Sequence, residues 1–299
     1  MNERQRIIVT GASGLIGTAL CRRLDTLGYE VVAYRSRHDG AHGMNQANRT
    51  IDKQGLEAAF AIIHLAGESI AQRWTPPARE RILTSRRENT LLLASALARL
   101  THKPEVFISM SGINRYGLRR TETLTEESAP MVDGFLPAVT EAWENATQPA
   151  LLAGIRTVLL RTAMVLSRHQ GGLSKMLPAF RLGLGGPIGG GRQRLSWIGL
   201  ADLVELIVWS LRNPSIHGPL NAVSPQPLAQ AEFARQLGAA LGRPACLPLP
   251  AWAISFLFGS MGRETILSDL AATPAVALAN GFRFTTPDLP AALAAALRE

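Results

Sequence analysis

The chain is poor in cysteine, and its 299 residues contain only Cys21 and Cys246. Two cysteines so far apart exclude a disulfide-framework fold, and they form no spacing typical of metal ligands. We therefore predict no metal site and a reduced, cytoplasmic compartment. Tyrosine is also scarce, with three residues, and none of them is followed four positions later by a lysine.

Long apolar runs are missing as well. The segment "AWAISFLFG" at 251–259 is too short to cross a bilayer, and it favours a buried or partner-facing helix. The first residues, "MNERQR", meet an apolar run without a cleavage-site pattern, so we expect no signal peptide. We therefore expect no membrane partner.

No large block of one charge occurs, although the formal net charge is +8. The densest basic group, at 78–89, contains four arginines interleaved with Glu80 and Glu88, which is typical of a solvated helix face. Because the basic residues are scattered, we predict no nucleic-acid partner. A ligand that carries phosphates explains the basic balance at least as well.

What the chain does contain is a regular alternation of apolar runs and helical patterns. Strand-like runs recur at 7–10, 29–35, 61–67, 105–111, 154–162 and 218–224. Apolar residues at helical spacing lie between them, at 15–27, 54–60, 77–100, 135–152 and 200–213. This order predicts an α/β fold with a doubly wound, mainly parallel sheet and helices on both of its faces.

The pattern changes after residue 165, where a glycine-rich loop and then proline-rich segments follow. We predict a dinucleotide-binding domain over 1–165, completed by about 195–224. Residues 166–194 and 225–299 would form a smaller substrate-side lobe and a C-terminal extension. Neither an internal repeat nor a flexible linker separates the two parts.

Three glycines stand between the first strand and the first helix, in "VTGASGLIGTAL". Gly11 would allow a tight turn, Gly14 would let the backbone approach a pyrophosphate, and Gly17 would let the helix pack closely on the strand. The N-terminus of the helix would then face the phosphates. We predict an NAD(P)-binding Rossmann domain whose cofactor contacts include Gly11, Ser13, Gly14, Leu15, Ile16 and Gly17.

The same segment resembles the extended short-chain dehydrogenases/reductases, the fold of nucleotide-sugar epimerases. "HLAG" at 64–67 resembles the strand that lines the cofactor in that family, and Asn89 and Thr90 partly match its Asn-x-x-Thr region. "LLRTAMVLS" and "SWIGLADLV" resemble two later segments of the family, although Asp202 reads more simply as a helix N-cap. The resemblance implies further cofactor contacts from Leu65, Ala66, Gly67 and Asn89.

A closer resemblance extends over nearly the whole chain. "HLAGESIAQRW", "KMLPAFRLGLGGPIGGGRQ" and "GFRF…PDL" are similar to an uncharacterised epimerase-like branch of this superfamily. The C-terminal extension of that branch has no assigned role. The resemblance therefore specifies fold and cofactor more closely than reaction.

The end of the second strand favours NADP(H) over NAD(H). A carboxylate there would accept hydrogen bonds from a ribose 2′-hydroxyl, whereas a basic residue would pair with a 2′-phosphate. Arg35 and Arg37 stand at this point, and no acidic residue occurs between Val31 and His38. The alternative is that both are exposed loop arginines. Asp52 either touches the adenine edge or caps the helix that follows.

The usual chemistry of the family needs a Tyr-x-x-x-Lys pair, and this chain has none. By the resemblance, Leu136 stands at the tyrosine position and Thr140 at the lysine position. Leucine carries no proton, and threonine carries no charge. The absence argues against ordinary hydroxyl oxidation by the family mechanism.

A few acid–base and polar candidates remain. Ser111 matches the substrate-polarising serine and Tyr116 matches a Tyr-Gly near the family's site; the alternative for Tyr116 is a packing role. Glu144 reads as an ordinary helix carboxylate, and His64 as a buried, hydrogen-bonded histidine. Tentative substrate contacts are Glu68, Arg73, Trp74 and Arg192, each of which could also be an ordinary surface or loop residue.

Together these features predict an NADP(H)-dependent oxidoreductase or epimerase-like enzyme that acts on an unknown small molecule. The alternative is a non-catalytic NADP(H)-binding sensor or regulatory protein, which the missing pair favours. Members of the family often dimerise through two helices, which here would be 77–100 and 135–152, so we expect a possible homodimer.

Overall fold

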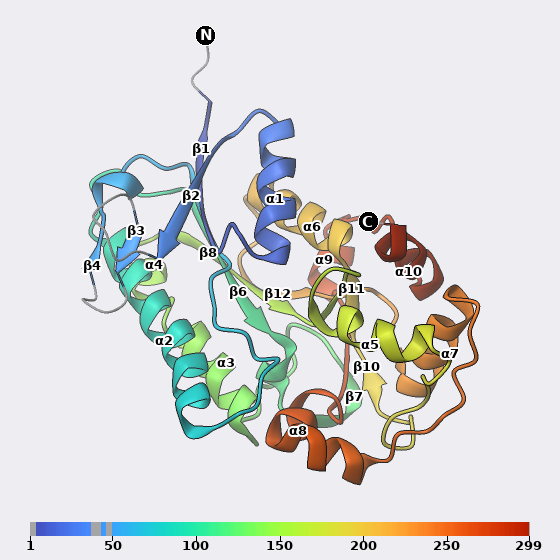
Figure 1. Cartoon of the computed structure of the whole chain (residues 1–299). Coiled ribbons are helices and arrows are strands. Elements are labelled where there is room, and N and C mark those ends of the chain that lie inside the picture. Colours follow the sequence, from blue (N-terminus) through green and yellow to red (C-terminus); the bar gives the residue numbers. More distant parts are fainter. Residues whose placement is uncertain (1–3, 37–42, 46–49, 299) are drawn as a thin grey trace.

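A central sheet of eight strands organises the computed structural model, which describes residues 4–36, 43–45 and 50–298 (Figure 1). Its strands in spatial order are β12 (Gly218–Ala222), β8 (Arg156–Thr162), β6 (Val106–Gly112), β5 (Ala61–His64), β1 (Arg6–Thr10), β2 (Glu30–Ser36), β3 (Gly43–Asn45) and β4 (Thr50–Ile51). Neighbouring strands are parallel except for β3 and β4. The predicted doubly wound α/β fold is confirmed.

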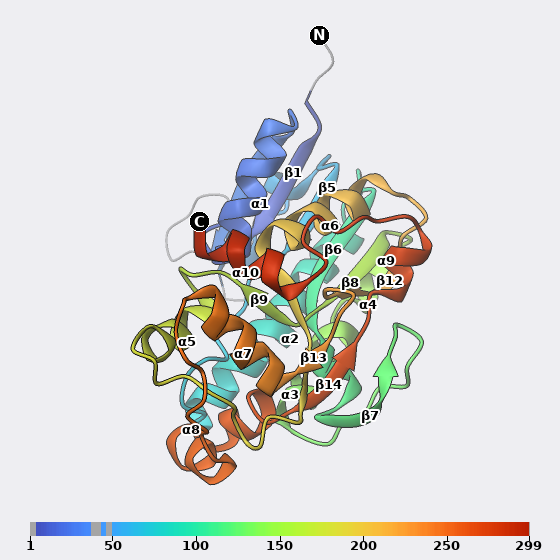
Figure 2. The same cartoon turned by 90° about the vertical axis from the view of Figure 1, so that its right-hand side faces the viewer.

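Helices cover both faces of this sheet (Figures 1 and 2). One face carries α1 (Leu15–Thr26) and α6 (Leu200–Arg212), which contact each other. The other carries α2 (Pro76–Ala98), α3 (Phe135–Asn145) and α4 (Gln148–Leu152).

The central strands are buried on both sides, as a continuous apolar run in a parallel sheet predicts. In β1, Ile7 and Val9 pack toward α1 and α6, while Ile8 packs toward α2 and α4. Because side chains alternate along a strand, one short run supplies both halves of the core.

Two predicted helices are shorter than expected. The pattern at 135–152 divides into α3 and α4, because the Thr147 hydroxyl and amide bond back to the carbonyl of Glu144 and Pro149 then begins a new helix. Since proline has no amide hydrogen, it cannot continue a helix but fits the first turn of the next one. The pattern at 54–60 forms only a 3₁₀ turn, η1 (Gln54–Leu56).

A second group of short elements packs against the carboxyl ends of the sheet strands (Figure 2). Its helices are α5 (Gly171–Arg181), α7 (Gln230–Ala240), α8 (Ala251–Thr265) and α10 (Leu289–Arg298), whereas α9 (Ala275–Ala279) packs beside β12 in the core of the sheet. Its strand pairs are β7 (Arg119–Leu124) with β14 (Asp269–Ala272), β9 (Met164–Leu166) with β11 (Trp197–Gly199), and β10 (Arg194–Leu195) with β13 (Leu228–Ala229). Trp197 and Phe233 lie fully buried at its centre.

The predicted apolar helix at 251–259 is the first part of α8. Ile254 and Ala253 face inward, whereas Trp252 and Phe256 are 73% and 82% exposed. No helix among the described residues is long and apolar enough to cross a membrane.

Asp202 ties the C-terminal segment to the sheet domain. The side chain is 1% exposed, and one oxygen accepts hydrogen bonds from the amide and hydroxyl of Thr285, at 2.7 and 2.6 Å. The other oxygen accepts two more from Thr286, at 3.0 and 2.6 Å. Its partners are thus loop groups across the interface, and α6 has no side-chain N-cap.

Replacing this carboxylate should destabilise the whole chain. In Asp202→Asn the side-chain nitrogen cannot accept the Thr286 bonds, and hydrogen bonds to a charged group are worth about 1.5–3 kcal/mol each. We expect a loss of about 3 kcal/mol in the free energy of unfolding, measured by urea denaturation. Asp25→Asn, at an exposed position on α1, is the matched control. Equal stability of the two variants would show that the contact is dispensable.

Candidate functional site

At the glycine turn between β1 and α1, the backbone of the turn lies close to that of α1 and of the segment after β5. Gly11 has a φ of +70°, and a Cβ there would lie 2.8 Å from the amide nitrogen of Ala66. A Cβ at Gly17 would lie 2.2 Å from the carbonyl oxygen of Gly11. Both positions therefore require glycine, Gly11 for its conformation and the neighbouring strand end, Gly17 for contact between helix and turn.

The N-terminus of α1 is open. Its N-cap, Gly14, has no side chain to cap the first turn, and no acidic residue lies there. Gly14 and Ser13 are exposed, whereas Leu15 and Ile16 are partly buried. Since the first amides of a helix lack partners inside the helix, this end can bind an anion such as a phosphate.

The loop after β5 lies beside this turn. Leu65 and Ala66 are partly buried and Gly67 is exposed, and the amide of Ala66 donates to the hydroxyl of Thr10 at 3.3 Å. Asn89, another predicted cofactor contact, lies buried on α2. The structure thus brings the turn and the 65–67 loop together at the ends of β1 and β5.

His64 anchors the floor of this region. It is fully buried, and its ring nitrogens contact the hydroxyls of Thr10 at 2.7 Å and Thr90 at 3.0 Å. Burial, together with the positive charge of Arg86, lowers the pKa of His64 to about 4. A neutral ring can donate through one nitrogen and accept through the other, so this histidine has a structural role, as the sequence suggested.

The structure describes only some of the residues predicted to contact the ribose and its 2′-phosphate. Arg35 lies in β2 with its backbone opposite Gly43, but its side chain and the whole of Arg37 lie outside the described residues. Asp52 accepts the amide of Gly55 at 3.2 Å through its carboxylate, and its carbonyl accepts the hydroxyl of Tyr34 at 2.8 Å. The carboxylate of Asp52 thus bonds within the turn that leads into η1, whose N-cap is Lys53 and has no side-chain cap, and its contact with the adenine stays a prediction.

The two positions of the missing catalytic pair lie on the buried side of α3. Leu136 is 3% exposed and packs with Trp74 and Ile82. The Thr140 hydroxyl donates to carbonyls of its own helix, at 3.0 Å to Leu136 and 2.9 Å to Pro137. Neither side chain presents a titratable group.

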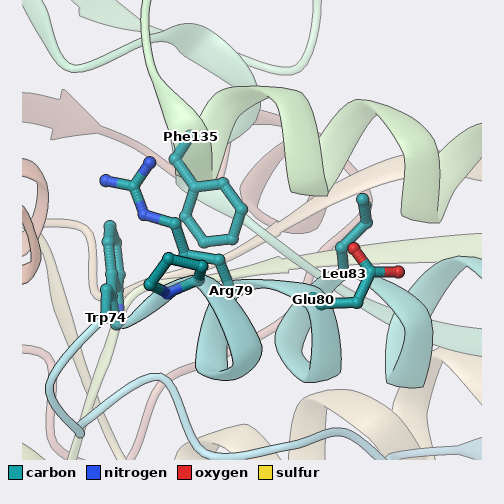
Figure 3. A pocket seen from close by; sticks show the side chains of 6 residues that line it. Trp74, Arg79, Glu80, Leu83 and Phe135 are labelled. Atoms are coloured by element: carbon teal, nitrogen blue, oxygen red, sulfur yellow. The ribbon is translucent and has the colours of Figure 1, made fainter.

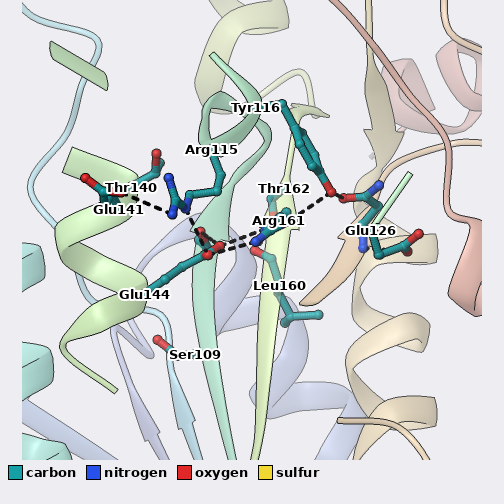
Figure 4. Close-up of polar contacts among 12 residues, drawn as sticks. Ser109, Arg115, Tyr116, Glu126, Thr140, Glu141, Glu144, Leu160, Arg161 and Thr162 are labelled. Carbon is teal, nitrogen blue, oxygen red and sulfur yellow. Dashed lines mark hydrogen bonds and ion pairs between the residues drawn. The ribbon is translucent and has the colours of Figure 1, made fainter. Parts of the chain in front are cut away.

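One turn farther along α3, Glu144 forms a buried ion pair with Arg161 of β8 (Figure 4). The guanidinium donates to both carboxylate oxygens, at 2.8 and 2.9 Å, and each side chain is 7% exposed. Burial alone would lower the pKa of Arg161, but the hydrogen bonds and charge of Glu144 outweigh it and raise that pKa. Glu144 is therefore an ionised anchor rather than an ordinary helix carboxylate.

Both predicted catalytic hydroxyls join this ion pair. Ser111 donates to Glu144 at 2.8 Å, and Tyr116 accepts from Arg161 at 3.0 Å and donates to Asn221 at 2.7 Å. Tyr116 is fully buried, and burial raises its pKa. Their catalytic roles stay predictions, since the structure shows both groups engaged in holding α3, β6, β8 and β12 together.

The predicted substrate residues lie at separate places. Trp74 walls a shallow pocket of about 410 Å³ together with Arg79 and Phe135, between the first turns of α2 and α3 (Figure 3). The guanidinium carbon of Arg79 lies 5.0 Å from the centre of the Phe135 ring. Arg73 and Arg192 are exposed, and the carboxylate of Glu68 accepts from Gln72 at 3.0 Å.

Two arginines were missed by the sequence reasoning. Arg161 stands inside the apolar strand "VLLRT", a position that alone signals a buried partner. Arg86 belongs to the charged run at 78–89, but it turns inward: its guanidinium lies 4.9 Å from the ring centre of buried Trp143. The interpretation of that run as a solvated face does not hold at Arg86. Among the described residues, no group of acidic, histidine or cysteine side chains could hold a metal ion.

The sheet order and the glycine turn define the class of Rossmann-fold proteins. The model of the NAD dependent epimerase/dehydratase family matches residues 7–221, and the chain belongs to this family. A second model, a domain of unknown function (DUF1731), matches residues 249–296. The resemblance to an epimerase-like branch with a C-terminal extension is thereby confirmed.

Similar proteins share the whole length. Epimerase family protein SDR39U1 of Homo sapiens is 36% identical over 293 residues, 96% of this chain and 98% of the relative. Epimerase family protein YfhF of Bacillus subtilis is 33% identical and covers 96% of each chain. The crystal structure of human SDR39U1 (isoform 2) with NADPH matches with a TM-score of 0.89 at 34% identity, covering 98% of this chain and 99% of that one. The cofactor in that structure agrees with the one predicted here.

His64 should make the fold sensitive to mild acid. Its folded pKa of about 4 lies below the unfolded value of about 6.5, so its contribution is complete above pH 6.5 and is lost as the pH falls toward 4. Between pH 7 and 4.5 we expect wild type to lose about 2.5 kcal/mol more stability than His64→Gln, by urea unfolding. His217→Gln, at an exposed position, should behave as wild type. Parallel losses in all three proteins would contradict the assignment.

Proposed function

We propose that the chain binds NADP(H) and acts as an oxidoreductase or epimerase-like enzyme on a small molecule. The observation that carries the proposal is the open N-terminus of α1 at a turn where Gly11 and Gly17 leave no room for side chains. The NADPH in the crystal structure of human SDR39U1 supports it. Residues 11–17, the 65–67 loop and Asn89 would hold the cofactor, which when bound supplies or accepts a hydride.

Arg35 is the residue we propose to select NADP(H) over NAD(H). It stands in β2 directly after Tyr34, in a segment without any carboxylate from 31 to 36. A guanidinium can hold a 2′-phosphate through two hydrogen bonds, whereas a carboxylate would repel it.

Proton transfer cannot follow the usual route of the family, because Leu136 and Thr140 replace the pair. An ionised Glu144 only accepts hydrogen bonds, so the hydroxyl of Ser111 donates to it and keeps lone pairs free to accept. We propose that Ser111, or a water beside it, receives a hydrogen bond from a substrate hydroxyl. Tyr116 would act through Arg161 rather than on substrate.

Substrate recognition is proposed for the surfaces that face the C-terminal extension. Trp74 and the pocket beside it suit a planar group, and the exposed Arg73 and Arg192 suit an anionic one. Glu68 is proposed to accept hydrogen bonds from donor groups of a substrate. Arg79 already reaches Ser260 of α8 at 2.8 Å, so the extension lies next to this pocket.

The second candidate is a non-catalytic NADP(H) sensor or regulatory protein. The observation that favours it is the engagement of both candidate hydroxyls in the Glu144–Arg161 network. For either function we propose a cytoplasmic homodimer that pairs through α2 and α3–α4 and binds no nucleic acid. The free thiols of Cys21 and Cys246 suit a reducing compartment.

Titration with NADPH and NADH tests the cofactor assignment. We expect tighter binding of NADPH, and in Arg35→Ala a loss of about ten- to a hundredfold for NADPH with little change for NADH, since one charge-assisted contact is worth about 1.5–3 kcal/mol. Isothermal calorimetry gives both constants. Arg22→Ala, at an exposed position on α1, controls for net charge. Tighter NADH binding in wild type would refute the assignment.

Consumption of NADPH in the presence of aldehydes, ketones and nucleotide sugars separates enzyme from sensor. An oxidoreductase should oxidise bound NADPH with at least one substrate class, and an epimerase should convert a nucleotide sugar to its epimer without net cofactor consumption. In either case Ser111→Ala should lower kcat roughly a hundredfold if Ser111 manages the proton. Ser109→Ala, two positions earlier on β6, is the control. Tight NADPH binding with neither NADPH consumption nor epimer formation across the panel would support the sensor instead.

A further inference from the structure

Arg86 of α2 holds a positive charge directly under the proposed cofactor loop. Its guanidinium packs beneath Gly67, where a Cβ would lie 3.3 Å from the guanidinium carbon. Its guanidinium carbon also lies 4.9 Å from the ring centre of Trp143, which stands on α3 three residues after Thr140. The charge therefore sits between the 65–67 loop and the helix that lost the family's lysine.

No carboxylate of the described part of the chain neutralises this charge by contact. One guanidinium nitrogen donates to the carbonyls of Glu68 at 2.9 Å and Ile82 at 3.3 Å, and no ion pair of Arg86 occurs among the residues the structure describes. The carboxylate of Glu68 acts on it from a distance, but it is 38% exposed and lies 3.8 Å from Arg81. A neutral carbonyl orients the guanidinium without cancelling its field.

The charge persists at neutral pH, and its field reaches the cofactor region. Burial lowers the pKa of Arg86 to about 10, with Glu68 opposing the shift, so the group stays protonated near pH 7. The same charge contributes to the low pKa of His64, whose ring contacts Thr10 at the start of the glycine turn. The positive potential thus extends from α2 to the ends of β1 and β5.

We propose that Arg86 makes the site discriminate between the two redox states of the cofactor, in favour of NADPH over NADP⁺. This inference rests on the proposed function. Oxidised and reduced cofactor share their phosphates and differ by one positive charge on the nicotinamide ring. Because like charges repel in a partly desolvated site, an uncompensated guanidinium penalises only the oxidised form. The site then retains the reduced cofactor and releases the oxidised one.

This role differs from that of Arg161, another inward-facing arginine of the region. Arg161 is paired on both carboxylate oxygens of Glu144, so its charge is largely cancelled. Within the described residues, Arg86 contacts two carbonyl oxygens and an aromatic face. Of the two, Arg86 can therefore act on the charge state of a bound ligand.

Calorimetric titration with NADPH and with NADP⁺ tests the proposal on wild type, Arg86→Gln, Arg86→Lys and Arg87→Gln. Wild type should bind NADPH at least tenfold more tightly than NADP⁺, and Arg86→Gln should reduce that ratio about tenfold. Arg86→Lys should keep most of the ratio, because it keeps the charge. Arg87→Gln changes net charge equally at an exposed neighbour and should leave the ratio unchanged.

A second variant, expected to shift the affinity ratio in the opposite direction, keeps the test valid if Arg86→Gln misfolds. Glu68→Gln removes the one carboxylate that opposes the field and should raise the NADPH to NADP⁺ affinity ratio severalfold. The inference would be overturned, with NADP(H) binding intact, by a wild-type NADPH to NADP⁺ affinity ratio near one. It would also be overturned if the ratio were unchanged in both Arg86→Gln and Glu68→Gln. Failure of wild type to bind either form would overturn the proposed function itself.

Discussion

The buried pair of Glu144 and Arg161 is the interaction on which the rest of this site depends. Two short hydrogen bonds join α3 to β8, and Ser111 and Tyr116 attach β6 and the η2 turn (Ile113–Tyr116) to the same centre. Asn221 of β12 completes the chain of contacts. Removing Glu144 would leave the charge of Arg161 unpaired in the interior, so the arrangement depends on this carboxylate.

This centre and the Arg86 site use charge in opposite ways. At Glu144 the opposite charges are matched, and the hydroxyls around them serve the packing of helix on sheet. At Arg86 the guanidinium contacts carbonyl oxygens and an aromatic ring, which hold its position and leave its positive charge uncompensated. A region without the lysine of its family thus still contains a fixed positive charge, supplied from α2 instead of α3.

The parts of the fold that follow from local sequence were predictable. The glycine turn could be read from "VTGASGLIGTAL" because its requirements are local: a positive φ at Gly11 and no side chain at Gly17. The continuous apolar runs likewise predicted a sheet with helices on both of its faces. The break between α3 and α4 was missed, since it depends on how Thr147 and Pro149 cooperate at one helix end.

The sequence by itself determined the class of fold, the position of the nucleotide turn and the absence of the Tyr-x-x-x-Lys pair. Each of these depends on residues that lie close together in the sequence. Only the tertiary structure decided the partners of Glu144, Arg86 and Asp202. Arg161 lies 17 positions from Glu144, and Thr285 lies 83 positions from Asp202. Charge compensation depends on distances in space and on burial, and a chain's order of residues states neither.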